Sequence, residues 1–201
     1  MRLSTPARNL TLAVTGASGA AFAREILRAV EADSRVEVVN WIVSDGGLRV
    51  LAEELEITGR SDLLQQVLGA PPKKTKHQSC NDIGANIASG SYPTDAMIVL
   101  PCSVGTLGRI ANGFANNLIE RAADVCLKEQ RPLILCVRET PFNKVHIRNM
   151  GLAADAGATI FPVMPTFYNQ PQDSAAMARQ FVARVLAHVG LEPSDMYRWK
   201  C

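Results

Sequence analysis

The stretch LTLAVTGASGAAF, residues 10–22, decides the fold. Its first part, residues 10–15, is a short apolar run ended by a glycine, which is typical of a buried strand. After Gly16, apolar side chains in residues 20–32 recur near helical spacing. A strand, a glycine-containing turn and a helix in this order indicate the opening βα unit of a parallel sheet.

The same alternation continues along the chain. Further strands are predicted at 36–43, 96–100, 132–137 and 159–161, and further helices at 45–55, 61–68, 104–112, 116–129, 143–156 and 174–189. The strands are apolar throughout, which indicates a parallel sheet with helices on both faces. We therefore expect an α/β protein whose ligands bind beyond the carboxyl ends of the strands.

Three local features set expected boundaries between elements. Ser61 is a candidate cap for the third predicted helix, and Pro101 is expected to end the strand that precedes it. Residues 73–94 show no regular pattern, and the basic run Lys73–Lys76 within them is expected in a solvated loop. This stretch is therefore predicted to be the least regular part of the chain.

The composition is that of a globular protein. The 201 residues are 47% hydrophobic and 20% charged, and they suit a single domain over residues 1–201. A net charge of only +2 argues against a nucleic-acid-binding protein, which would show a clustered basic face. No apolar run approaches the roughly 20 residues of a membrane-spanning helix, so a membrane protein is not expected.

The cysteines indicate the compartment. None of the five forms a C-x-x-C pair, so neither a zinc ribbon nor a redox pair is indicated. Their odd number and the lack of a signal peptide lead us to expect a reduced, cytoplasmic protein.

The turn GASG, residues 16–19, lacks the middle glycine of the dinucleotide fingerprint G-x-G-x-x-G. The acidic residue expected after the second strand is also missing, because Val43 is followed by Ser44. Both features disfavour an NAD-dependent oxidoreductase. Glycines, a hydroxyl and a helix N-terminus suit a flavin or another anionic ligand, although a purely structural turn is an alternative.

Polar residues follow the later strands as well. Ser103 begins a predicted helix, where it can contact a ligand or cap the helix. Arg138 can bind phosphate through paired donors and Glu139 can act as an acid or base, whereas the alternative is a surface ion pair. Tyr168 suits the mouth of a pocket, and a buried tyrosine is its alternative. Cys102 is expected to be a small buried residue.

Six blocks of sequence together resemble the UbiX/Pad family of flavin prenyltransferases. They are TGASGA, ASGS, PCSVGTLGRIANG, NNLIERAADVCLKEQRPLILCVRETPF, HIRNM and PTFYNQPQ. The resemblance covers residues from about 10 to 192, with short extensions at both ends, and it is weak at about 56–82. It implies a flavodoxin-like, Rossmann-type fold and a dodecamer with active sites between subunits. It also implies that reduced FMN and dimethylallyl phosphate are the substrates and that no metal is required.

The implied reaction joins the dimethylallyl group to N5 and C6 of reduced FMN. The product, prenylated FMN, would then serve a separate UbiD-type decarboxylase. Whether the donor is the monophosphate or the diphosphate stays open. Ring closure must remove an aromatic proton, which the phosphate or Glu139 can take, while Ser18 can relay or position it. Glu139 and Ser18 are expected to matter most for this step.

The resemblance also implies the residues of the site. The flavin would contact Gly16, Ala17, Ser18, Ser44, Ser103, Val104, Gly105, Thr106 and Arg138. The prenyl phosphate would lie among Ser89, Gly90, Lys128, Arg138, Tyr168 and Arg184. A further family glutamate falls on Glu54, with adjacent Glu53 as the alternative. Arg121 matches a family arginine and has a structural ion pair as its alternative reading.

Two other functions are weighed against this one. An FMN-dependent decarboxylase of the same fold would call for a catalytic histidine after an early strand and a PxMNxxMW-like block, and this sequence shows neither. His146 lies on a predicted helix of mixed polarity, where a structural histidine is expected. A non-catalytic flavin carrier would need no second phosphate site, so the cationic set with Lys128 and Arg184 argues against it.

Overall fold

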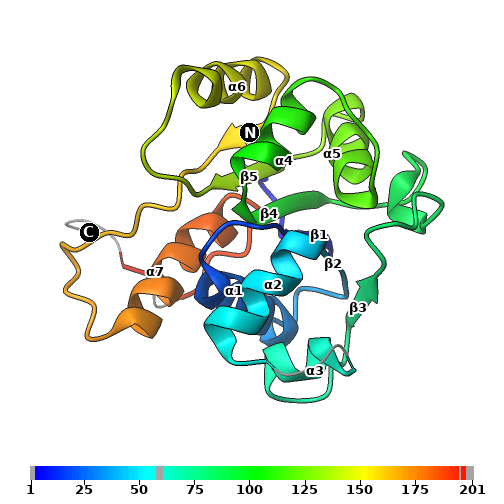
Figure 1. Ribbon diagram of the computed structural model, residues 1–201. Helices are drawn as coiled ribbons and strands as arrows, with labels where there is room; N and C mark the ends of the chain where they lie inside the picture. Colours follow the sequence, from blue (N-terminus) through cyan, green and yellow to red (C-terminus); the bar gives the residue numbers. More distant parts are fainter. Residues whose placement is uncertain (1–2, 58–60, 195, 198–201) are drawn as a thin grey trace.

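Six parallel strands form one sheet in the computed structural model, in the order β3-β2-β1-β4-β5-β6 (Figure 1). The structure describes residues 3–57, 61–194 and 196–197. The elements are β1 (Asn9–Val14), α1 (Ala20–Ala32), β2 (Val38–Val43), α2 (Asp45–Leu55), α3 (Leu63–Leu68), β3 (Thr75–Gln78), the short 3-10 helix η1 (Asn86–Ala88), β4 (Ala96–Cys102), α4 (Val104–Ala111), α5 (Leu118–Lys128), β5 (Leu133–Val137), α6 (Lys144–Asp155), β6 (Thr159–Ile160) and α7 (Ser174–Ala187). This order is the doubly wound, Rossmann-type order.

The central strands are buried on both faces, as their continuous apolar sequence predicts. In β4, Ile98 packs into the core beneath α1, α2, α3 and α7, while Met97 and Val99 pack into the core beneath α4, α5 and α6. The alternation follows from the strand geometry, because successive side chains point to opposite faces of the sheet. The prediction of a parallel α/β sheet with helices on both faces is confirmed.

The prediction for residues 73–94 was wrong in part, because β3 lies there as an edge strand. The strand TKHQ is polar, but it pairs on one side only, with β2, and two of its four side chains are exposed. An edge strand needs no continuous apolar run, so the sequence pattern missed it. The basic run is correspondingly not a free loop: Lys74 Nζ donates to the backbone oxygens of Asp33 and Val36 at 2.5 and 2.8 Å.

Two predicted boundaries also differ from the structure. Strand β4 continues through Pro101, with an irregular register, and pairs again at Cys102 with Val137. Proline is tolerated because its carbonyl oxygen, not a missing N–H, makes the contact with the loop after β1. Ser61 does not cap α3: Asp62 holds the capping position in a left-handed conformation without a side-chain cap.

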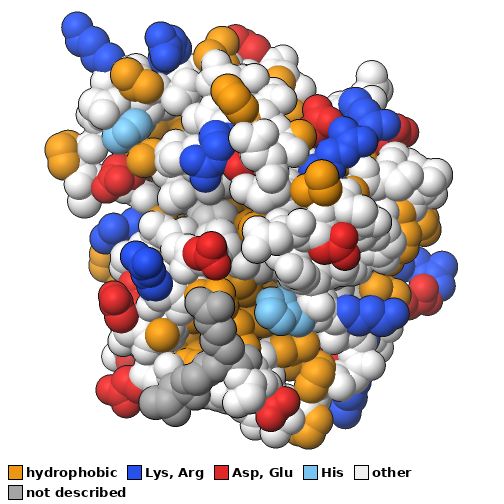
Figure 2. Space-filling view, turned by 45° about the vertical axis from the view of Figure 1, so that its right-hand side comes forward, with side chains coloured by type: hydrophobic (Ala, Val, Ile, Leu, Met, Phe, Trp, Pro, Cys, Tyr) orange, Lys and Arg blue, Asp and Glu red, His pale blue; other side chains and the backbone are white. Residues whose placement is uncertain are grey.

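The strand order reverses between β1 and β4, because the chain adds β2 and β3 on one side and β5 and β6 on the other. In open α/β sheets, the crevice at such a reversal is where ligands bind. The loops that follow β1, β2 and β4 meet there. Among the described residues, no helix is long and apolar enough to cross a membrane. Basic and acidic side chains are interspersed across the face drawn in Figure 2.

Candidate active site

A cleft of about 310 Å³ opens at the carboxyl ends of β1, β2 and β4. Its walls are Gly16, Ser44, Asp45, Gly46, Cys80, Asn81, Ser103, Thr106, Arg109, Asn117 and Ile119. Four of the predicted flavin residues, Gly16, Ser44, Ser103 and Thr106, therefore lie around one space although three separate loops carry them. Ala17, Val104 and Gly105 are their immediate neighbours in the chain.

Glycines and a buried threonine hold these loops together. A Cβ on Gly16 would lie 3.1 Å from Cα of Gly46, so an ordinary side chain at either position would push the two loops apart. A Cβ on Gly47 would lie 2.6 Å from the carbonyl oxygen of Val14. The Thr15 hydroxyl donates to the Pro101 oxygen at 2.9 Å and accepts from Ser103 N–H at 2.8 Å. Close backbone contacts and these two hydrogen bonds therefore fix the positions of the loops around the cleft.

Two helices begin at the cleft. The Ser44 hydroxyl accepts from Gly47 N–H at 3.1 Å and caps α2, and the Ser103 hydroxyl accepts from Thr106 N–H at 3.3 Å and caps α4. Both serines therefore cap a helix, which is the alternative role considered for Ser103, and both also line the cleft. Helix N-termini and hydroxyl groups together favour an anion, so the walls fit the phosphate of a mononucleotide.

Glu54, which lies on α2, caps the N-terminus of a third helix, α1. Its carboxylate accepts from Gly19 N–H at 3.0 Å and from Ala20 N–H at 2.7 Å, at the start of α1. Burial raises the pKa of Glu54, but hydrogen bonds from Ser18, Gly19 and Ala20 and the charge of Arg138 outweigh it, so the pKa is lowered overall. Of the two adjacent glutamates, Glu54 is therefore the one that reaches Ser18 and the GASG turn.

Arg138 and Glu139 follow β5, at the same end of the sheet. Arg138 N–H donates to the Cys102 oxygen at 3.1 Å, and its charge acts on Glu54. Glu139 is half-buried, and its carboxylate accepts from Thr140 N–H at 2.9 Å. The two form no ion pair with each other among the described residues, so the alternative of a surface ion pair is wrong.

Tyr168 and Arg184 lie together in a second cavity of about 540 Å³, beside α1 and α7. Tyr168 is exposed and packs against Tyr197 with ring centroids 5.4 Å apart, so it is not a buried tyrosine. The Arg184 guanidinium lies 5.9 Å from the centre of the Phe161 ring. Arg184 is exposed, so one chain leaves its guanidinium open to solvent beside this ring.

Ser89, Gly90 and Lys128 lie apart from both of these sites. Lys128 ends α5, which leads into the amino end of β5, and the loop at Ser89 leads into the amino end of β4. Figure 1 shows this region beside α5 on the right, and the loop before α7 on the left. Lys128 Nζ lies 2.6 Å from Glu129 Oε1. One chain therefore does not bring the predicted prenyl-phosphate residues together.

Other candidate residues have structural roles. Burial raises the pKa of the Cys102 thiol to about 12, which confirms a small buried residue. His146 closes a capping box with Asn143 at the start of α6, which confirms a structural histidine. Arg121 pairs with Asp124 at 2.8 Å. Within the described ranges, no three His, Cys, Asp or Glu side chains gather where they could hold a metal ion.

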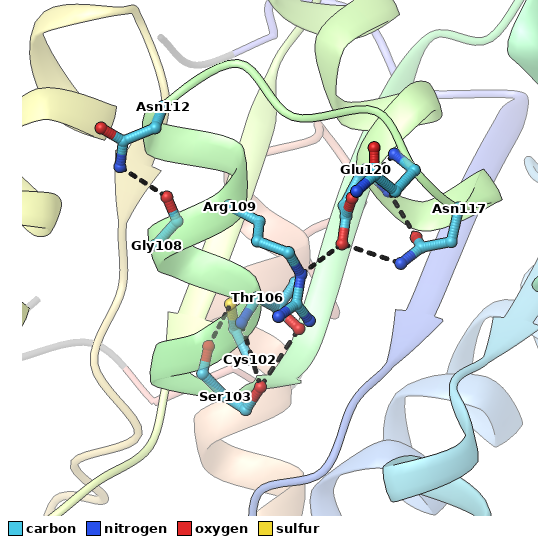
Figure 3. Close-up of polar contacts among 9 residues, drawn as sticks. Cys102, Ser103, Thr106, Gly108, Arg109, Asn112, Asn117 and Glu120 are labelled. Atoms are coloured by element: carbon cyan, nitrogen blue, oxygen red, sulfur yellow. Dashed lines mark hydrogen bonds and ion pairs between the residues drawn. The ribbon is translucent and has the colours of Figure 1, made fainter.

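Several residues that line the cleft were not predicted from the sequence. Arg109 reaches it from the far end of α4, and Asn117 from the start of α5, where Glu120 joins the two (Figure 3). Arg109 lies three residues after Thr106, so the two share one face of α4. That spacing was the signal that could have found Arg109, and Asp45 directly follows the predicted Ser44 at the start of α2. Asn81, in the loop after β3, had no such signal.

A parallel sheet with an anion-binding cleft at its order reversal defines a nucleotide- or flavin-binding α/β protein. In agreement, residues 2–186 match the model of a family described as Flavoprotein. The flavin prenyltransferase UbiX of Pseudomonas aeruginosa is 39% identical, over 98% of this chain and 96% of that relative. The chain belongs to the UbiX family of flavin prenyltransferases.

Two solved structures are similar over nearly their whole length. The crystal structure of AnUbiX (PadA1) in complex with FMN and dimethylallyl pyrophosphate has a TM-score of 0.85 and 35% identity, and covers 96% of this chain and 98% of that one. That of a dodecameric FMN-dependent UbiX-like decarboxylase from Escherichia coli O157:H7 has a TM-score of 0.84 and 35% identity, and covers 96% and 100%. The expected flavodoxin-like, Rossmann-type fold is confirmed.

Proposed function

We propose that this flavin prenyltransferase joins the dimethylallyl group of dimethylallyl phosphate to N5 and C6 of reduced FMN. The product, prenylated FMN, leaves for a UbiD-type decarboxylase. The whole chain acts as one domain, in the cytoplasm. The observation that carries the proposal is the pairing of an anion-binding cleft with a separate cationic cavity that holds Tyr168 and Arg184.

The cleft at β1, β2 and β4 takes the flavin phosphate. The α2 and α4 N-termini and the hydroxyl groups of Ser44, Ser103 and Thr106 surround one space, and no carbon side chain intrudes where Gly16 meets Gly46. Such a site suits a phosphate group better than a neutral ligand. Ser18 and Arg138 both act on Glu54, and we assign these three residues to the flavin ring.

The prenyl donor binds where two copies of the chain meet. Tyr168 and Arg184 come from one copy, and Ser89, Gly90 and Lys128 come from a neighbour, because one chain holds these groups in separate regions. We propose a dodecamer, in line with the assembly named for the Escherichia coli relative. Facing copies would bring three cationic side chains, Lys128, Arg138 and Arg184, to one phosphate group.

Each of these residues has its own role in the proposed reaction. The cations and the Tyr168 hydroxyl stabilise the phosphate as the allylic C–O bond breaks, since positioned donors act most strongly where charge develops. The exclusion of water by the assembled cavity protects the allylic carbon. FMN, when bound, supplies N5 and C6 as the atoms that accept the prenyl group. N5 would lose its proton as it takes the allylic carbon, and a proton would add to the prenyl double bond so that its other end can bind C6. Glu139, positioned with Ser18, takes the proton that must then leave C6.

Mass spectrometry tests the function directly. The protein is incubated without oxygen with reduced FMN and either dimethylallyl phosphate or the diphosphate, and the released flavin is weighed. A flavin heavier by one prenyl unit supports the proposal, and the more active donor settles the choice between the two phosphates. Unchanged FMN with both donors, despite tight flavin binding, contradicts it and favours a flavin carrier or a decarboxylase.

A further inference from the structure

Arg109 is the one cationic side chain on the walls of the cleft, within the described part of the chain. It stands on the last turn of α4, and its side chain runs back toward the start of that helix, as long helical side chains do. A Cβ on Gly105 would lie 3.7 Å from Arg109 Nη1, so the guanidinium lies over the first turn. Arg109 thus reaches the helix end that Ser103 and Thr106 form (Figure 3).

A buried carboxylate orients this guanidinium. The side chain of Glu120 is 1% exposed, whereas that of Arg109 is 48% exposed, and Arg109 Nε donates to Glu120 Oε1. Asn117 Nδ2 donates to the same oxygen at 2.8 Å, and Asn116 N–H donates to Oε2 at 2.9 Å. A carboxylate with three donors has one conformation available to it, so the arginine that pairs with it is held as well.

The ion pair uses only one of the three guanidinium nitrogens. Among the residues described, neither Nη1 nor Nη2 of Arg109 makes a hydrogen bond. Cys80 lies on the wall of the cleft near Arg109. Burial raises the pKa of the Cys80 thiol, the charges of Asp45 and Glu120 raise this pKa further, and the charge of Arg109 lowers it. Arg109, Asp45 and Cys80 line the same space.

We propose that Arg109 binds the phosphate of FMN through Nη1 and Nη2, and that Glu120 is the residue that positions it. The inference rests on the proposed function, because it assigns a further contact to the same flavin. Two parallel N–H donors match the geometry of a phosphate group. Asp45 stands on the same wall and opposes an anion, so Arg109 supplies the charge that makes the cleft selective for FMN over riboflavin, which lacks the phosphate.

The test compares the affinities of oxidised FMN and riboflavin by flavin fluorescence. We expect Arg109→Ala to weaken FMN binding by about tenfold or more, since the loss of even one of its two charge-assisted hydrogen bonds has that effect, and to leave riboflavin binding unchanged. Arg109→Lys should restore part of the difference, since it keeps the charge without the fork. Arg8→Ala is the matched control, because Arg8 also pairs with a glutamate, Glu37, at the opposite end of the sheet.

The Glu120→Gln variant distinguishes a role of Glu120 in positioning Arg109 from a role in supporting the fold. It should lower the ratio of FMN to riboflavin affinity by a smaller factor than Arg109→Ala, since the amide oxygen still accepts from Nε. An equal loss for both flavins would show that Glu120 only supports the fold. An unchanged ratio in Arg109→Ala, with tight FMN binding by the wild type, would overturn the inference and leave the proposed function standing. A wild type that binds neither flavin would overturn both.

Discussion

The proposed flavin cleft and the proposed prenyl-phosphate residues differ in how the chain assembles them. The cleft lies at one end of one sheet, and a pair of glycines and a buried threonine hold the loops after β1, β2 and β4 together there. The prenyl-phosphate residues lie in two regions, with Lys128 toward the amino ends of the strands and Arg184 beside the α7 cavity. The residues that line the cleft come from a single chain, whereas a single chain does not bring Lys128 and Arg184 together.

Flavin binding and prenyl transfer should therefore respond differently to the assembly of several copies of the chain. A single copy holds every wall of the cleft, so its affinity for FMN should depend on that copy alone. The transfer reaction should depend on contacts between copies.

The largest effect is expected for the prenyl-phosphate residues. Lys128→Ala and Arg184→Ala should each lower kcat/KM for the prenyl donor by about 10²- to 10³-fold, because each removes a cation from the departing phosphate. When the two variants are co-expressed and purified as mixed assemblies, about a quarter of the sites receive both native residues if neighbouring copies share each site. Activity should therefore return to about a quarter of the wild-type value.

Activity that stays at the level of the separate variants would place Lys128 and Arg184 in one chain's site, or outside any site. Wild type co-expressed with Arg8→Ala controls for the mixing itself, since Arg8 lies away from both regions.

The next effect concerns turnover. Glu139→Gln should lower kcat by about 10²-fold, because the amide cannot take the proton from the flavin. FMN affinity should stay unchanged, since Glu139 is not a wall of the cleft. Single-turnover absorbance of the product measures the rate. If Glu139→Gln and Ser18→Ala both form the product at the native rate, the assignment of the proton transfer is wrong; Glu37→Gln is the control.

A smaller effect is expected inside the cleft. Gly16→Ala should weaken FMN binding by about tenfold, because its Cβ would press on Cα of Gly46 at 3.1 Å and part the loops. Mixed assemblies of Gly16→Ala with Thr106→Val should not recover affinity, since both residues belong to one chain's cleft. Titration with FMN measures this. Gly151→Ala is the control, because its Cβ would meet nothing within 4 Å.

Recovery of FMN affinity in those mixed assemblies would mean that the cleft, too, is shared between copies. The cleft and the prenyl-phosphate residues would then not differ in their dependence on neighbouring copies.

The smallest effect concerns stability. Glu54→Ala should lower the free energy of unfolding at pH 7 by about 0.5–1 kcal/mol, the low end for a lost cap, because Glu54 is exposed. The lowered pKa of Glu54 means that this contribution is present above its unfolded pKa of about 4.3 and is lost as the pH falls through the folded value. The difference from wild type should therefore narrow in acid.

Denaturant unfolding at pH 7 and below pH 4 measures this difference. Glu53→Ala is the matched control, because Glu53 makes no hydrogen bond among the described residues. An equal loss in both variants would contradict the capping role.

The sequence was sufficient where the signal is local. The apolar strands and periodic helices predicted the parallel sheet, because burial on both faces demands continuous apolar runs. Glycines and hydroxyl groups directly after strands marked four walls of the cleft, since the carboxyl ends of parallel strands meet at one edge. The polar strand β3 escaped detection because an edge strand carries no such run.

Tertiary structure alone decided which residues share a space. Arg109 and Glu120 join through packing of α4 on α5, and Glu54 reaches the GASG turn only because α2 packs beside α1. The separation of Lys128 from Arg184 likewise has no trace in the spacing of the two residues. Local propensity and burial act between neighbours in the chain, so the sequence determined the elements and the loops that carry function. Contacts between distant segments arise only when the elements pack, so the structure decided what those loops face.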